Sequence, residues 1–113
     1  MSQQCCQKLT PEQYSVFLKE NTGLAVVGYL STDLLASRQT QILVNTAQAM
    51  GARASFAVLH PAYGSYFESE LKLEGSPTYL LYFAGIEQRR LLGAVDYDDL
   101  RELIYGPAGD VAV

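Results

Sequence analysis

Gly75-Ser76-Pro77-Thr78-Tyr79-Leu80-Leu81-Tyr82-Phe83 is the stretch of this sequence that decides the fold. After the proline, aromatic and aliphatic side chains follow one another with no charged residue between them, which is typical of a strand covered on both faces. Proline has no N–H, so it can open a strand but cannot lie in its middle. The stretch therefore predicts a buried strand that begins directly after Pro77.

The residues that follow predict a hairpin and a helix. Ala84-Gly85 is a turn signal, and Ile86 to Leu92 reads as a second strand that Gly93 closes. Beyond it, the segment Asp96 to Ile104 begins with acidic residues and has the apolar spacing of a helix. The C-terminal part of the chain is thus expected to be a β-hairpin followed by a helix.

The residues before this stretch predict alternating helices and strands. Thr10 can cap a first helix, with Pro11 at its first position and Gln13 completing a capping box. Leu24 to Leu30 is a continuous apolar run, which favours a central strand of an α/β sheet. The segment Cys5 to Leu9 is compatible with a short edge strand or a loose arm.

The middle of the chain continues this alternation. An apolar stripe predicts a second helix that ends at Gly51; it consists of Leu35, Ile42, Leu43, Thr46, Ala47 and Met50. Arg53 to Leu59 is expected to be a strand, and Tyr66 to Leu73 a weaker helix with Phe67 and Leu71 on its apolar side. The residues between these two elements, His60 to Gly64, are expected to form a loop.

Composition narrows the classes of function. The chain has 113 residues and 49% hydrophobic residues, enough for one domain with one core. Its net charge of -4, without clusters of Lys or Arg, argues against nucleic acid or an anionic membrane as a partner. No apolar run reaches the length of a membrane span, and the N-terminus lacks the features of a signal peptide. We therefore expect a cytoplasmic protein.

Two short motifs and the order of elements resemble the thioredoxin family. Gly75-Ser76-Pro77-Thr78 matches the family's Gly-Ile-Pro-Thr, and Leu92-Gly93-Ala94-Val95 matches its Val-Gly-Ala-Leu loop. The similarity runs without an insertion from about Leu24 to Ile104. It implies an α/β thioredoxin-like fold, with a central mixed sheet of four or five strands flanked by helices and a C-terminal β-hairpin and helix. It also implies a cis Ser76–Pro77 peptide bond.

On this resemblance, residues 1–113 form a single domain. Its core is expected over about residues 9–105, with a flexible N-terminal arm and a C-terminal tail.

The resemblance fails at the position of the redox motif. Redox-active thioredoxins carry Trp-Cys-Gly-Pro-Cys where this chain has Thr32-Asp33-Leu34-Leu35-Ala36. The buried aspartate that assists proton transfer in the family corresponds to Val27. Disulfide exchange needs a thiolate that attacks sulfur, and no side chain at this junction supplies one. We expect no catalytic residue here, no cofactor and no metal, since the single His and the two Cys lack ligand spacing.

The resemblance also implies a binding face. In thioredoxins a substrate peptide lies across the active-site turn, the residue before the cis-proline and the glycine loop after the last strand. The corresponding residues here are Thr32, Asp33, Leu34, Ser76, Pro77, Gly93 and Ala94. Leu34 lies off the apolar stripe of the second helix and is expected to face outward.

Three residues have competing interpretations. Asp33 is either a helix N-cap or a general base, and its place before a helix favours the cap. Cys5 and Cys6 are either two reduced thiols or a displaced redox pair. Neighbouring Cα atoms lie about 3.8 Å apart, closer than a relaxed disulfide prefers, which favours the reduced thiols.

Three functions follow from these observations. The first is a redox-inactive thioredoxin-fold domain that binds a protein or peptide partner through the face matching the thioredoxin active site. The second is a thiol-disulfide oxidoreductase or redox sensor that uses Cys5 and Cys6. The third is a structural or dimerisation module that uses another face.

Overall fold

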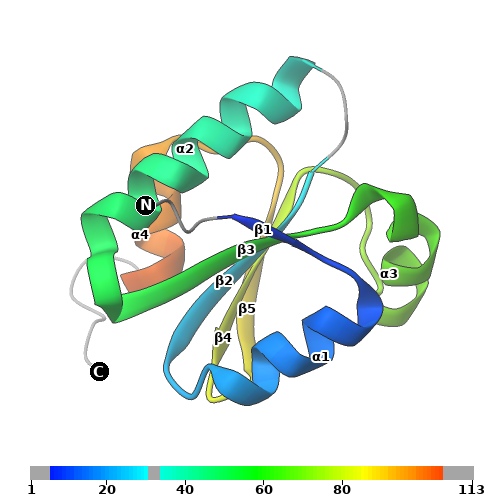
Figure 1. Ribbon diagram of the computed structural model, residues 1–113. Helices are drawn as coiled ribbons and strands as arrows, with labels where there is room; N and C mark the ends of the chain where they lie inside the picture. Colours follow the sequence, from blue (N-terminus) through cyan, green and yellow to red (C-terminus); the bar gives the residue numbers. More distant parts are fainter. Residues whose placement is uncertain (1–5, 31–33, 106–113) are drawn as a thin grey trace.

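A computed structural model describes residues 6–30 and 34–105; the side chains of residues 34–36 lie outside that description. The described residues form a five-stranded mixed sheet in the order β1-β3-β2-β4-β5, flanked by helices (Figure 1). The elements in chain order are β1 (Gln7–Leu9), α1 (Pro11–Glu20), β2 (Leu24–Tyr29), α2 (Leu34–Met50), η1 (Gly51–Arg53), β3 (Ala54–Leu59), η2 (Pro61–Tyr63), α3 (Gly64–Leu71), β4 (Thr78–Phe83), β5 (Ile86–Leu92) and α4 (Tyr97–Tyr105).

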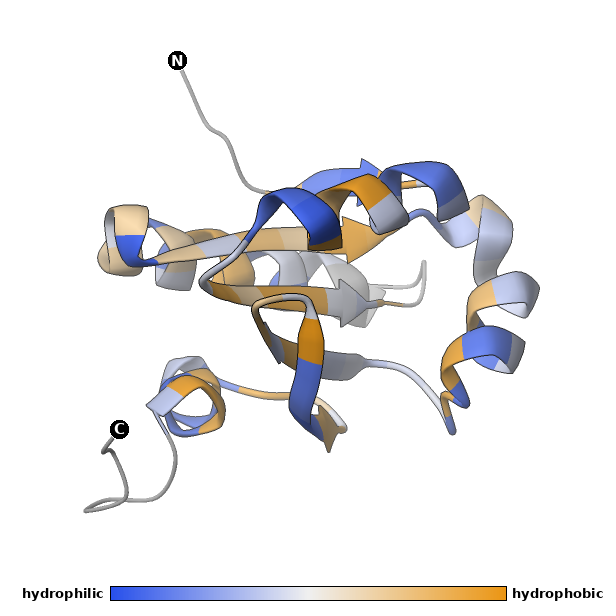
Figure 2. Cartoon of the chain, turned by 90° about the horizontal axis from the view of Figure 1, so that it is seen from below, coloured by the Kyte–Doolittle hydropathy of each residue, from blue (hydrophilic) through white to orange (hydrophobic). Residues whose placement is uncertain are grey.

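The sheet lies between two layers of helices. On one side, which we call the α2–α4 side, a core cluster joins Leu43 of α2 and Leu100 of α4 to the strands. On the other, the α1–α3 side, Phe67 of α3 and the half-buried Phe17 of α1 pack against the sheet. In Figure 2 most of the hydrophobic colour lies on the central strands. The predicted α/β thioredoxin-like architecture is therefore confirmed, with five strands.

Strand β4 is an interior strand of the sheet, between β2 and β5. It pairs antiparallel with β2 on one side and with β5 on the other. The residues from Thr78 to Tyr82 are buried, as expected of a strand with both faces covered. Phe83 differs, since 51% of it is exposed. It is the last residue of β4, directly before the hairpin turn that leads to β5.

Local capping signals set the helix boundaries as predicted. Thr10 and Gln13 form a reciprocal capping box at α1, with Pro11 at the first helical position. At α4, Asp99 N–H donates to Asp96 Oδ1 and Asp96 N–H donates to Asp99 Oδ2, at 2.9 and 3.0 Å. These carboxylates satisfy N–H groups that have no partner inside the helix.

Both ends of helix α3 differ from those predicted by two residues, and several other elements differ by one or two residues. Helix α3 begins at Gly64 rather than Tyr66, because a 3₁₀ turn leads straight into it: His60 Nδ1 accepts a hydrogen bond from Ala62 N–H. It ends at Leu71 rather than Leu73, since Lys72 adopts a left-handed backbone with φ 55°. The segment 60–64 is thus not a plain loop.

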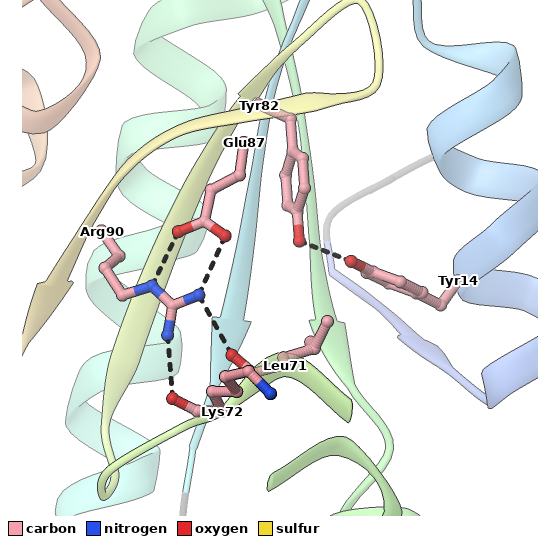
Figure 3. A network of polar contacts seen from close by, with 6 residues as sticks. All are labelled: Tyr14, Leu71, Lys72, Tyr82, Glu87 and Arg90. Atoms are coloured by element: carbon pink, nitrogen blue, oxygen red, sulfur yellow. Dashed lines mark hydrogen bonds and ion pairs between the residues drawn. The ribbon is translucent and has the colours of Figure 1, made fainter. Parts of the chain in front are cut away.

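Strand β5 contains a bulge that gathers charged side chains on one face. Leu81 lies opposite Arg89 but Tyr82 lies opposite Glu87, so Gln88 is an extra residue in β5. The Arg90 guanidinium bonds both Glu87 carboxylate oxygens and also donates to the backbone carbonyls of Leu71 and Lys72, both at 3.1 Å (Figure 3). Arg90 therefore ties β5 to the C-terminus of α3.

The neighbouring arginine does the same on the opposite face. Arg89 donates to the carbonyls of Leu103 and Ile104 in the last turn of α4, at 2.7 and 3.4 Å. Adjacent residues of a strand point to opposite faces of the sheet. Two consecutive arginines thus satisfy the carbonyl ends of two helices on opposite sides. Among the described residues, no helix is long and apolar enough to cross a membrane.

Candidate functional site

Four chain segments meet at one end of the sheet. Tyr29 at the end of β2 lies opposite Thr78 at the start of β4, and Thr78 lies opposite Leu92 at the end of β5. Because β3 runs parallel to β2, its last residue Leu59 and the following His60 reach the same end. In α/β sheets this end is where ligands commonly bind. We call it the proline end of the sheet.

The Ser76–Pro77 peptide bond, at the start of β4, is cis. Its neighbours hold it on both sides: Gly93 N–H donates to Pro77 C=O at 2.8 Å, and the Thr78 hydroxyl donates to Gly75 C=O at 2.6 Å. Pro77 is buried, whereas Ser76 is exposed. Ser76 is therefore exposed to solvent between two residues, Gly75 and Pro77, whose carbonyl groups accept hydrogen bonds.

The loop after β5 depends on a glycine. Gly93 has φ +116°, a backbone conformation that side chains with a Cβ rarely adopt. Because this glycine turns the chain, its N–H points back to Pro77 while Ala94 stays exposed and Val95 is buried. The predicted Gly93-Ala94 segment therefore lies directly beside Ser76-Pro77.

Gln39 fastens helix α2 to this loop from inside the core. Only 1% of Gln39 is exposed. Its Nε2 donates to Val95 C=O and its Oε1 accepts from Val95 N–H, both at 3.0 Å. The same Oε1 accepts a hydrogen bond from the Tyr79 hydroxyl. One amide side chain thus connects α2, the glycine loop and β4 close to Pro77.

Tyrosine hydroxyls near this end are held in their neutral form. Burial raises the pKa of Tyr79. Burial, together with the hydrogen bond that Tyr29 donates to Glu68 at 2.5 Å, raises the pKa of Tyr29 to about 12. Both groups therefore act as hydrogen-bond donors at neutral pH, and they anchor the sheet to helices on its two sides.

The structure brings together four of the predicted site residues: Ser76, Pro77, Gly93 and Ala94. Thr32 and Asp33 lie outside the described residues. Leu34 is the first residue of α2, and its side chain is also outside the description. Helix α2 starts at the end of β2, so its N-terminus lies at the proline end.

Sequence reasoning missed Gln39 and its partner Tyr79. A signal for Gln39 was present, because it lies four residues after Leu35 and four before Leu43, on the predicted apolar stripe of α2. A polar residue on such a stripe needs a buried partner. The partner itself, the backbone of Val95, is 56 residues away in sequence.

Cys6 requires a correction. The sequence favours a reduced thiol, yet Cys6 is disulfide-bonded in the structure, and it packs at the margin of the α2–α4 core. Cys5 lies outside the described residues. Over residues 6–30 and 34–105, no group of three or more His, Cys, Asp or Glu is arranged to hold a metal ion.

These features define an α/β domain of the thioredoxin fold, with a cis-proline and a glycine loop at one end of its sheet. No protein-family model matches the sequence, and no curated protein matches it. Among solved structures, mitochondrial thioredoxin 3 from Saccharomyces cerevisiae in its oxidized form superposes with a TM-score of 0.75 at 19% identity, over 88% of this chain and 92% of that one.

Two further thioredoxins superpose equally well. The thioredoxin of Plasmodium falciparum gives a TM-score of 0.76 at 17% identity, over 87% of this chain and 95% of its own. The thioredoxin of Fasciola hepatica gives a TM-score of 0.76 at 19% identity, over 88% of this chain and 95% of its own. At these identities the similarity establishes the fold, and function has to be argued from the site itself.

Proposed function

We propose that this domain binds a protein or peptide partner in extended form at the proline end of the sheet and does not catalyse disulfide exchange. The observation that carries the proposal is the exposed residue Ser76 beside a buried, hydrogen-bonded Pro77. A backbone that is already fixed loses little conformational entropy when a ligand binds. An extended peptide can pair with such a segment as an added strand.

The neighbouring loop supports the same role. Ala94 is exposed beside Ser76, and Gly93 leaves this surface without a side chain. Buried hydrogen bonds from Gln39 to Val95 and from Tyr79 to Gln39 connect the loop after β5 with β4. These contacts favour a binding surface that is already ordered without a partner. Rigid elements under a binding surface favour affinity and specificity.

The sequence argues against disulfide exchange at this end. Asp33 and Ala36 stand where the redox thioredoxins have their two cysteines, and the only cysteines of the chain are Cys5 and Cys6. The buried position of the proton-transferring aspartate is occupied by Val27, which is fully buried and apolar. The proposed role is therefore recognition, with Thr32, Asp33 and Leu34 completing the binding face.

A second candidate function rests on Cys6. Its disulfide is the observation that favours thiol-disulfide chemistry at the Cys5-Cys6 pair. In that case exchange would take place next to β1, on the opposite edge of the sheet from β5. The two candidates therefore predict that different substitutions abolish function.

The test compares variants of the tagged domain in affinity purification from its host. We expect Leu34→Asp to lose the partners that the unaltered domain retains, while its circular dichroism and thermal melting stay unchanged. Gln48→Asp is the matched control, since Gln48 is an exposed residue of the same helix far from its N-terminus. Partners lost with Cys6→Ser but retained with Leu34→Asp would support thiol chemistry instead. Partners retained by every variant would move the function to another face.

A further inference from the structure

A row of apolar side chains lies at the other end of the sheet from the proline end, near the turn between β4 and β5 at the bottom of Figure 1. Leu24 of β2 lies opposite Phe83 of β4, and Phe83 lies opposite Ile86 of β5. Residues directly opposite one another in antiparallel strands point to the same face of the sheet. Leu24 packs against the core of the α2–α4 side, so all three side chains lie on that side. We call them the hairpin row.

The outer part of the hairpin row is exposed. Phe83 is 51% exposed and Ile86 66%, and neither belongs to a core cluster of the described residues. Tyr79 and Leu81, which precede Phe83 on the same face of β4, are buried in the core of the α2–α4 side. A single exposed apolar residue means little. An adjacent aromatic and aliphatic pair that continues a core is a surface on which a further segment can pack.

Helix α4 ends beside this row. Arg89 lies on the α2–α4 side, because it is opposite Leu81, and it donates to two carbonyls in the last turn of α4. Arg89 and Ile86 lie opposite Leu81 and Phe83, which are two residues apart on one face of β4. Arg89 and Ile86 are therefore neighbours on that face, and the chain leaves α4 close to Ile86.

The sequence after α4 contains residues that fit the hairpin row. Gly106 and Pro107 favour the end of the helix, and Ala108-Gly109-Asp110-Val111-Ala112-Val113 follows. Residues 106–113 can reach up to about 26 Å when extended, whereas the row crosses three strands, about 10 Å. In an extended segment Val111 and Val113 face the same way. The segment is therefore long enough to place two valines on the row.

Charge complementarity indicates how the segment is oriented. Asp110 is the only charged residue of 106–113, and it directly precedes Val111. Arg89 uses Nε and Nη2 for its bonds to the helix carbonyls, and its Nη1 has two further N–H groups to donate. A carboxylate of Asp110 at this nitrogen would bring Val111 to Ile86 and Val113 to Phe83.

We propose that residues 110–113 dock in extended form on the hairpin row of their own chain, with Asp110 paired to Arg89 and the two valines on Ile86 and Phe83. This docked segment replaces the flexible tail expected from the sequence. Because the segment is covalently attached, its effective concentration at the row is in the millimolar range, and a weak contact is sufficient to hold it. The site lies away from the proline end and does not depend on partner binding there.

The test is NMR of the full chain with labelled isoleucine and valine methyl groups. The chain has three isoleucines, Ile42, Ile86 and Ile104, so the Ile86 signal is readily assigned. We expect nuclear Overhauser effects from the methyls of Val111 and Val113 to the Ile86 methyl and the Phe83 ring, independent of protein concentration.

Substitutions within the segment test the contacts without altering the folded core. Val111→Asp/Val113→Asp should abolish these effects and move the Ile86 methyl signal. Asp110→Asn should move that signal part of the way in the same direction. Val16→Asp is the matched control, since Val16 is an exposed valine of α1, and it should leave the Ile86 signal in place.

Three results would overturn the proposal. The first is an Ile86 signal that stays unchanged in the double variant, with no effects between the valines and the row. The second is contact of Val111 and Val113 with residues outside the row. The third is effects that occur only between labelled and unlabelled chains in a mixed sample, which would assign the row to the segment of a second copy. An unchanged Ile86 signal in Asp110→Asn would refute the pairing with Arg89.

Discussion

Glu87 and Arg90 lie three residues apart on β5, yet their side chains meet on the same face of the sheet, with Arg90 Nε 2.7 Å from Glu87 Oε2. In a regular strand such residues would point to opposite faces. The bulge at Gln88 adds one residue and restores the shared face. The ion pair and the hydrogen bonds from Arg90 to the end of α3 therefore exist because of that extra residue (Figure 3).

A double-mutant cycle should separate the two tasks of Arg90. Glu87→Gln is expected to lower the free energy of unfolding by about 0.5 kcal/mol, as for an exposed ion pair. Arg90→Met should cost more, about 1–2 kcal/mol, since the carbonyls of Leu71 and Lys72 also lose their donor. Urea unfolding of the two single variants and the double variant measures the coupling. Equal costs for both single changes would show that the carbonyl contacts contribute nothing.

Gln39→Leu should be among the most destabilising single changes in α2. The substitution keeps the volume but leaves the N–H and C=O of Val95 and the Tyr79 hydroxyl buried without their partner. We expect a loss of about 2–4 kcal/mol in unfolding free energy and faster hydrogen exchange at Val95. The neighbouring exposed Thr40 provides the control, because Thr40→Ala should change stability by less than about 0.5 kcal/mol. Unchanged exchange at Val95 would argue that the loop is held by other contacts.

Stability should fall in alkali through the buried tyrosines. The pKa of Tyr29 is raised from 10.0 to about 12, so the folded state keeps its proton where the unfolded chain loses it. The contribution is therefore complete below pH 10 and is lost as the pH rises from 10 to 12. In that window the unfolding free energy of the unaltered chain should fall more steeply with pH than that of Tyr29→Phe. Urea unfolding measures both free energies. If they change in parallel with pH for the unaltered chain and Tyr29→Phe, the raised pKa of Tyr29 is contradicted.

The protein should not accelerate the reduction of insulin by dithiothreitol. No cysteine stands at the Asp33–Ala36 junction, so no thiolate is available there to attack a disulfide. Turbidity of the insulin solution measures the rate, with a redox-active thioredoxin as the positive control. A rate above background that disappears in Cys5→Ser or Cys6→Ser would instead establish chemistry at the adjacent cysteines.

Most of the architecture could be predicted because local signals and the global fold agree. Thr10, Pro11 and Gln13 specify the start of α1 through capping, and the apolar run after Pro77 specifies a strand buried on both faces. The β5 bounds, Ile86 to Leu92, follow from the flanking turn and glycine. At the site, the resemblance to thioredoxins implied that Ser76, Pro77, Gly93 and Ala94 are neighbours, and the structure places them together.

The remaining features depend on contacts between distant segments. Gln39 contacts Val95 only after the sheet has formed. The bulge at Gln88 contains no glycine that would predict it from the sequence. The start of α3 at Gly64 follows from a turn that His60 stabilises through its ring nitrogen, an interaction that residue periodicity does not reveal. Polar tertiary contacts of this kind leave no repeating pattern in a sequence.

The bulge in β5 also makes the two edges of the sheet differ in how readily they pair with strands of other molecules. A bulged strand carrying Glu87, Arg89 and Arg90 is twisted and charged, and it pairs poorly with the strand of another molecule. Within the described residues, the opposite edge has no such protection along Ala54 to Phe56, because β1 pairs only with Ala57, Val58 and Leu59. When this protein self-associates at high concentration, new strands should therefore add next to β3, and a lysine introduced at Ser55 should delay them.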